Sequence, residues 1–160
     1  MLIKTTRPGT EIEPDAGAYI ASLASHYANT DEIRSLASSI VSSAPAAWRP
    51  ADYNRAARTL YGTVKRWFRF VPDRGEYLLG FDDVRDPSRW FGDCDDAVII
   101  LGSLMASVGI PCSVLVMGDS AGPYHAALRG YGKVYDPTGV ITWWNKNGFK
   151  VWGEYPIEEE

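Results

Sequence analysis

Apolar residues in the first half of the chain recur every three or four positions, which is the period of an amphipathic helix. The spacing predicts helices over residues 18–27, 30–41 and about 51–68. Segments rich in serine, proline and glycine at 42–45 and 72–75 end the second and third helices. The residues of the third helix that we expect to face inward are Tyr53, Ala56, Ala57, Leu60, Val64, Trp67 and Phe68.

A fourth helix is predicted to begin at Gly92-Asp93-Cys94-Asp95-Asp96, after an interval at 76–90 that has no clear period. Small and acidic residues are common at helix starts. Gly109-Ile110-Pro111 is typical of a helix end. The apolar positions of this helix are Ala97, Val98, Leu101, Leu104, Met105 and Val108.

Short strand-like runs separated by turns follow this helix. The runs are 112–117, 124–128, 133–135, 140–144 and 149–152, with turns at 118–123 and 145–148. Helices followed by an antiparallel sheet predict an α+β fold. We expect a single domain over 1–160, with these parts: an N-terminal arm at 1–15, a helical part at 16–70, and the cysteine-bearing helix with the sheet at 90–155.

Composition narrows the class of protein. The chain has 160 residues, is 46% hydrophobic and carries a net charge of −4, which fits a globular protein and argues against nucleic-acid binding. We interpret the basic and aromatic run 65–69 as the polar and core faces of one helix. The longest apolar run, 97–101, is far shorter than a membrane span, and no signal peptide is evident. We therefore expect Cys94 and Cys112 to be thiols rather than a disulfide.

The candidate chemistry lies at Cys94. A thiol at a helix start faces backbone N–H groups and the positive end of the helix dipole, and both favour the thiolate. His125 and Asp136 follow along the chain. Cysteine, histidine and aspartate can supply a nucleophile, a base and a group that orients the base. The acids at 93, 95 and 96 raise the thiol pKa if they stay charged beside it, or serve as helix caps.

A hairpin count gives a geometric test of the histidine and aspartate. If Gly130-Tyr131 is a two-residue type II′ turn, Arg129 pairs with Gly132 and His125 pairs with Asp136. Directly opposed residues share one face of the sheet, with Cβ atoms about 4.5–5.5 Å apart. The count therefore predicts a hydrogen bond between the imidazole and the carboxylate.

Several of these motifs together resemble the transglutaminase-like superfamily, which has a papain-like core. They are Gly92-x-Cys94, the helix end at 109–111, a histidine on a following strand, and Tyr135-Asp136-Pro137-Thr138. The run 92–96 is most similar to the transglutaminase-like cysteine peptidases of bacteriophages and prophages, and the likeness spans about 51–138. The resemblance implies that Cys94 is the nucleophile, His125 the base and Asp136 its orienting acid.

By this resemblance the protein is a cysteine-dependent amide-bond hydrolase, or an acyl transferase, that forms a thioester on Cys94. It implies a protein or peptide substrate, no cofactor or metal, and a place in the host cytoplasm or the virion. The Cys94 backbone N–H is the expected oxyanion donor because it lies at the helix start, and the Trp90 indole is a candidate second donor. The sequence leaves water and an amine open as acyl acceptors.

Two other functions remain open at this stage. The first is an inactive structural or adaptor protein of a phage particle, which keeps the fold and binds phage structural proteins. Its interface would use the aromatic residues of the second half, including Trp143, Trp144 and Trp152. The second is a divalent-cation site on the acids at 93, 95 and 96, which is disfavoured because neighbouring helical positions diverge.

Overall fold

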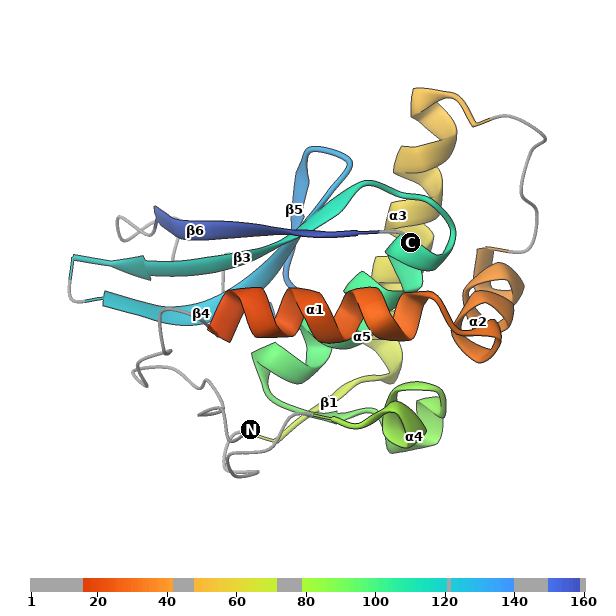
Figure 1. Cartoon of the computed structure of the whole chain (residues 1–160), viewed down its shortest axis with the longest axis horizontal. Coiled ribbons are helices and arrows are strands. Elements are labelled where there is room, and N and C mark those ends of the chain that lie inside the picture. Colours follow the sequence, from red (N-terminus) through yellow and green to blue (C-terminus); the bar gives the residue numbers. More distant parts are fainter. Residues whose placement is uncertain (1–15, 42–47, 72–78, 121, 140–149, 159–160) are drawn as a thin grey trace.

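The computed structural model describes residues 16–41, 48–71, 79–120, 122–139 and 150–158 (Figure 1). The arm expected at 1–15, the strand expected at 140–144 and the turn expected at 145–148 lie outside these residues. None of the helices in the described part of the chain combines the length and the apolar character that a bilayer crossing demands.

Helix α5 (Cys94–Ser107) is the centre of the fold. It is buried along almost its whole length, as expected for a helix that is apolar on every side. The helices packed around it are α1 (Ala16–Ala28), α2 (Asp31–Val41) and α3 (Pro50–Trp67). Two short helices, α4 (Phe81–Val84) and η1 (Pro87–Arg89), precede α5 and occupy the interval that showed no period.

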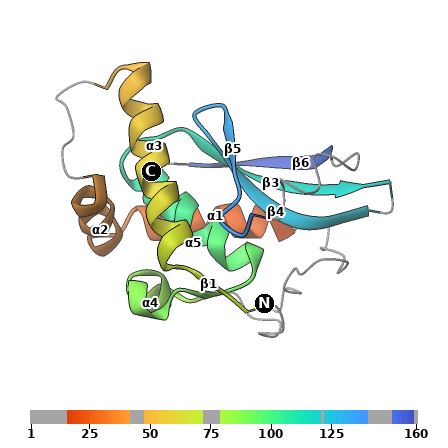
Figure 2. The ribbon, with the colours of Figure 1, turned by 180° about the vertical axis from the view of Figure 1, so that it is seen from behind.

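The sheet confirms the predicted α+β class. Its antiparallel strands are β3 (Cys112–Asp119), β4 (Gly122–Gly130), β5 (Lys133–Tyr135) and β6 (Lys150–Ile157), in the order β5-β4-β3-β6. Helices α1 and α5 pack together against it (Figures 1 and 2). A Cβ added to Gly102 of α5 would meet Ile157 at 2.5 Å, so glycine permits this close approach.

A second, parallel pairing was missed by the sequence analysis. Strand β1 (Arg69–Phe70) follows α3 directly and pairs with β2 (Phe91–Gly92), which leads into α5. The Arg69 N–H donates to the Trp90 carbonyl at 3.0 Å, and the Val71 N–H donates to the Gly92 carbonyl at 2.6 Å. Two-residue strands are too short to show a period in the sequence. This pairing fixes the end of α3 beside the start of α5.

One inward-facing residue was predicted wrongly. Trp67, the last residue of α3, is 43% exposed, whereas its neighbour Phe68 is buried. The helix ends at Trp67 and the chain continues into β1, so the helical period no longer decides which side chain turns inward. In the run 65–69 the basic residues and the Trp67 indole are therefore exposed, and only Phe68 is buried.

Helix α3 begins at a cap formed by Asp52. Its carboxylate accepts the Arg49 backbone N–H at 2.9 Å, and Pro50 occupies the first turn, where its missing N–H costs nothing. The hydrogen bond from the Arg49 backbone, followed by that from the Arg49 side chain, holds the pKa of Asp52 below its usual range.

Replacing Asp52 with asparagine is expected to lower the melting temperature at neutral pH. The melting temperature should also fall less steeply as the pH is lowered. A carboxylate with a lowered pKa stabilises the fold above its unfolded pKa, and this stability is lost as the pH falls through the folded pKa. Circular dichroism melts from neutral pH to about pH 3 measure the effect. Glu32→Gln removes an exposed charge from the first turn of α2 and is the control. Identical acid profiles for Asp52→Asn and the native chain would contradict the prediction.

Candidate active site

Cys94 occupies the first turn of α5, behind a cap built by its acidic neighbours. Asp93 is the N-cap, and its carboxylate accepts the Asp95 N–H at 3.2 Å. The Asp96 carboxylate reaches back to the Asp93 N–H at 3.1 Å and completes a capping box. The sequence left open whether these acids burden the thiol or cap the helix, and the structure shows that Asp93 and Asp96 cap it.

Asp96 also ties a remote segment to the helix start. Its second carboxylate oxygen accepts the Leu79 N–H at 2.9 Å, and both residues are buried. Gly92 has a φ of +151°, and a Cβ there would overlap the Asp96 carboxylate. The turn that presents Cys94 is therefore held by one carboxylate packed against a glycine. In the described part of the chain, no cluster of three or more His, Cys, Asp and Glu side chains is placed to hold a metal ion.

His125 and Asp136 are in direct contact. His125 lies on β4, and Asp136 follows the last residue of β5. The His125 Nε2 lies 2.8 Å from Asp136 Oδ2, and both side chains are nearly inaccessible to solvent. The predicted hydrogen bond between imidazole and carboxylate is thus confirmed.

The register that led to this prediction was wrong by two residues. Lys133 pairs with Gly130, Val134 with Arg129 and Tyr135 with Leu128, so the turn is Tyr131-Gly132. Both turn residues have positive φ, 46° and 82°, as a type I′ turn requires. A slip of two residues keeps every side chain on its face, since the side-chain period of a strand is two. Asp136 is therefore a diagonal neighbour of His125 rather than its direct partner, and a diagonal pair remains within reach of long side chains.

The second oxygen of the Asp136 carboxylate is held by Thr138, to which the sequence analysis assigned no role of its own. Asp136 Oδ1 accepts the Thr138 hydroxyl at 2.6 Å and the Thr138 N–H at 3.0 Å. The Tyr61 hydroxyl donates to the Asp136 carbonyl at 3.3 Å, and the Tyr61 ring packs on Tyr135. Burial raises the pKa of Tyr135. Short Asx-type turns of the Asp-Pro-Thr kind are the local signal that identifies such a clamp.

Thr138→Val is expected to loosen the Asp136 carboxylate, because it removes the hydroxyl donor while keeping the side-chain volume. We expect a destabilisation of about 1.5–3 kcal/mol, typical of a lost hydrogen bond to a charged group. Thr138→Ser restores the hydroxyl and should restore the stability. Urea unfolding measures the free energy of unfolding of both variants. Equal values for the valine and serine variants would show that the Thr138 hydroxyl does not hold the Asp136 carboxylate.

The expected role of Trp90 in binding an oxyanion is not supported. Trp90 is completely buried, and its indole N–H donates to the Val84 carbonyl at 2.8 Å. Its donor is thus bonded to the last residue of α4. Trp90 is a core residue that positions β2, and a second oxyanion donor is not assigned.

Cys94 and Cys112 are both thiols, and both are buried, with 2% and 7% exposure. The Cys94 Sγ lies 3.8 Å from the Asp95 Oδ1, within reach of a weak S–H hydrogen bond. The helix that carries Cys94 packs against β4, the strand that carries His125. The candidate site therefore lies inside the fold, at the junction of α5 with the sheet.

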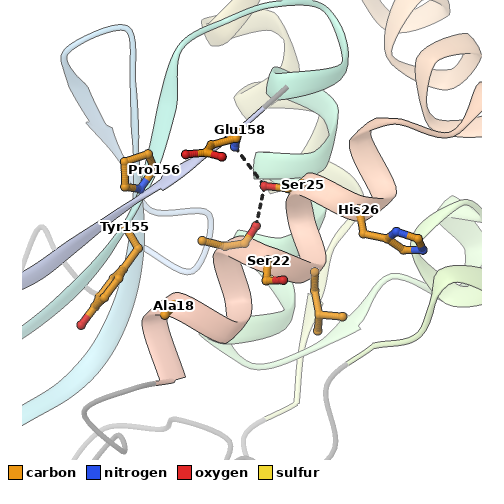
Figure 3. A pocket seen from close by; sticks show the side chains of 9 residues that line it. Ala18, Ser22, Ser25, His26, Tyr155, Pro156 and Glu158 are labelled. Carbon is orange, nitrogen blue, oxygen red and sulfur yellow. Dashed lines mark hydrogen bonds between the residues drawn. The ribbon is translucent and has the colours of Figure 1, made fainter. Parts of the chain in front are cut away.

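A pocket of about 610 Å³ lies elsewhere, between α1 and β6 (Figure 3). The residues that line it include Ser22, Ser25, His26, Tyr155 and Glu158, and none of Cys94, His125 and Asp136 is among them. The Ser25 hydroxyl accepts the Glu158 N–H and donates to the Ala21 carbonyl, both at 2.9 Å. These hydrogen bonds fasten β6 to α1, so the serine serves the fold.

The fold thus places a cysteine at the start of a central helix that packs on an antiparallel sheet. A solved structure from Cytophaga hutchinsonii, described as a candidate cysteine protease, has this fold, with a TM-score of 0.60 over 93% of the present chain. The two sequences are 16% identical, and the match covers 50% of the Cytophaga chain, so the present chain spans about half its length. No protein-family model and no curated protein matches the sequence.

Proposed function

We propose that the protein is a cysteine-dependent hydrolase of amide bonds in protein or peptide substrates. The observation that carries this proposal is the buried hydrogen bond of 2.8 Å between His125 and Asp136, in a fold that presents Cys94 at a helix start. A carboxylate on Nε2 orients the imidazole and stabilises its protonated form. The other ring nitrogen, Nδ1, is then the atom that exchanges a proton with the thiol.

The first half of the reaction forms a thioester. His125 takes the proton from Cys94, and the thiolate sulfur attacks the substrate carbonyl carbon, whose oxygen becomes negative. The Cys94 backbone N–H, at the helix start, is the proposed donor to this oxygen. The C–N bond then breaks, and the amine leaves with the proton from His125.

The second half returns the thiol. His125 takes a proton from water, and the resulting hydroxide attacks the thioester carbon. The C–S bond breaks, the acid is released, and the thiolate regains its proton from His125. An amine in place of water would give acyl transfer by the same steps. The nucleophile that reaches the thioester therefore decides whether the reaction is hydrolysis or transfer.

The test compares the alkylation rates of the two thiols of one chain. Cys112 is a matched control because it is also buried, so a difference in rate reports chemistry more than exposure. We expect iodoacetamide to modify Cys94 faster than Cys112, and to do so well below pH 8, where an ordinary thiol of pKa about 8.5 becomes unreactive. Peptide mapping by mass spectrometry gives both rates.

A second readout is release of a fluorophore from peptide amides. Hydrolysis that is lost in Cys94→Ser supports the proposal. Equal alkylation of the two cysteines at every pH, together with no hydrolysis, would contradict the proposed hydrolase.

A second candidate function is favoured by one observation, the burial of Cys94 at 2% exposure. A thiol that no substrate reaches suits a structural or adaptor protein that keeps the fold without catalysis.

From the resemblance of residues 92–96 to phage proteins, we propose a phage or prophage setting for either function, in the host cytoplasm or the virion. Co-purification with virion proteins in fixed ratio, unchanged by Cys94→Ser, would support the adaptor.

A further inference from the structure

An exposed patch of basic and apolar side chains lies where α3 passes into β1. Three apolar residues are unusually exposed there: Trp67 at 43%, Phe70 at 41% and Val71 at 38%. Lys65, Arg66 and Arg69 lie in the same stretch, residues 65–71, and are exposed as well. We call these six residues the β1 patch. We take exposed apolar side chains this close together in the chain as a candidate site of interaction.

The cations of the β1 patch differ from three arginines elsewhere in the molecule. Arg85, Arg89 and Arg129 each form an ion pair with a carboxylate, at 3.0–3.1 Å. Within the described ranges, no carboxylate lies within 4.0 Å of the Lys65, Arg66 or Arg69 charges.

The contacts that two of these cations do make leave their charge uncompensated. The Lys65 ammonium lies 5.7 Å from the Tyr61 ring centre, and the Arg69 guanidinium lies over Phe91 and donates to the Ser88 carbonyl. A ring face and a carbonyl carry no net charge. The β1 patch therefore keeps three positive charges, which favour an anionic partner.

The β1 patch adjoins the candidate nucleophile. Phe70 pairs with Gly92, two residues before Cys94. Neighbouring strands are about 4.8 Å apart and two residues span at most about 7 Å, so the Phe70 and Cys94 Cα atoms lie within about 12 Å. An extended chain covers this distance in three to four residues. A substrate held at Cys94 would thus reach the patch within a few residues of the reacting bond.

We propose, on the basis of the proposed function, that the β1 patch binds the substrate and selects extended peptide segments with acidic side chains next to apolar ones. Glutamate and aspartate would meet Lys65, Arg66 and Arg69, while leucine or phenylalanine would cover Trp67, Phe70 and Val71. The selection acts about three to four residues from the bond that is cleaved. A peptide fits better than a nucleic acid because the chain is negatively charged as a whole, at −4.

The test measures binding separately from turnover. The full chain carrying Cys94→Ser is titrated, by fluorescence anisotropy, into a labelled peptide of about ten residues, which spans roughly 33 Å when extended. In this peptide glutamate alternates with leucine or phenylalanine. Comparison probes are the same peptide with lysine for glutamate, the same with serine for the apolar residues, and a labelled oligothymidylate.

Matched variants locate the binding. Arg66→Glu and Trp67→Ser are each expected to weaken binding of the acidic peptide about tenfold, as anchoring residues do. Lys150→Glu and Trp152→Ser are the controls, because this basic and aromatic pair is also exposed, with the Lys150 ammonium 5.6 Å from the Trp152 ring centre. Its strand, β6, is an edge strand of the sheet, and Figures 1 and 2 show α1 and α5 between it and β1.

Each outcome decides between the two proposals. Preferred binding of the acidic peptide that is lost in the β1 variants supports the inference. Such binding without hydrolysis, together with equal alkylation of Cys94 and Cys112, keeps the peptide-binding role of the β1 patch and overturns the proposed hydrolase. Equal binding of the acidic and lysine peptides, preference for the oligothymidylate, or equal losses in the β6 controls would overturn the inference, even if other peptides were hydrolysed.

Discussion

His125→Ala is expected to lower peptide hydrolysis by roughly 10²–10⁴-fold, the usual contribution of a general acid–base residue. The imidazole is the proton carrier of both half-reactions in the proposed mechanism. The other histidine of the sequence, His26, lies on α1 and lines the pocket beside β6. The selective alkylation of Cys94 below pH 8 should disappear as well, leaving a rate similar to that of Cys112. Initial hydrolysis rates and peptide mapping measure the two losses.

Asp136→Asn is the matched control for this prediction. It keeps the size of the carboxylate but removes its charge and one of its acceptor oxygens, and both oxygens are in use, by His125 and Thr138. We expect a smaller loss of hydrolysis than in His125→Ala, because the base is present but poorly oriented. Circular dichroism must show both variants folded. A folded His125→Ala protein with native hydrolysis would refute the assigned base.

Gly92→Ala is expected to destabilise the fold by about 3–5 kcal/mol, by summing backbone strain, overpacking and lost hydrogen bonds. A Cβ at this position overlaps the Asp96 carboxylate, which must then release the N–H groups of Asp93 and Leu79. The positive φ adds strain for any residue with a side chain. Urea unfolding measures the loss.

Gly132→Ala separates the two causes. Gly132 has a φ of +82°, but nothing lies within 4 Å of the Cβ that alanine would add. It should therefore cost only the strain, about 1–2 kcal/mol. Similar losses for the two glycine variants would show that Asp96 gives way at little cost. In Asp96→Ala the overlap is gone but two buried N–H groups lose their acceptor, so that variant should be destabilised as well.

The longer helices and several strands were predictable because each has a hydrophobic period that extends over enough residues to be recognised. Helix α5 was recognised from its apolar spacing and its acidic start, and strand β5 was placed at 133–135 as observed. The β1–β2 pairing was not predictable, since it joins two-residue strands 22 positions apart. Strand β6 continues five residues beyond the expected end, through Pro156, because pairing with β3 decides its length.

The sequence predicted that His125 and Asp136 share one face of the sheet, but it did not predict the register of their strands. His125 and Asp136 were placed together by a turn that proved to be Tyr131-Gly132 instead of Gly130-Tyr131. The error was harmless because it equalled the side-chain period. The roles of Thr138 and of the hydrogen bond between Asp96 and Leu79 were missed, because hydrogen bonds to buried carboxylates produce no periodic pattern in the sequence. Trp90 was misassigned because its partner, Val84, lies in a segment without regular spacing.

The parallel pairing of β1 with β2 also affects how the chain can vary in length. The chain departs from the strand pair at Phe70 and returns to it at Phe91, and the two strands hold these points side by side. Lengthening such a closed excursion costs little entropy, about 0.6 kcal/mol for each doubling. New residues inserted there would border the cysteine turn without stretching it. This interval is therefore where we expect relatives to gain or lose segments while the nucleophile keeps its place.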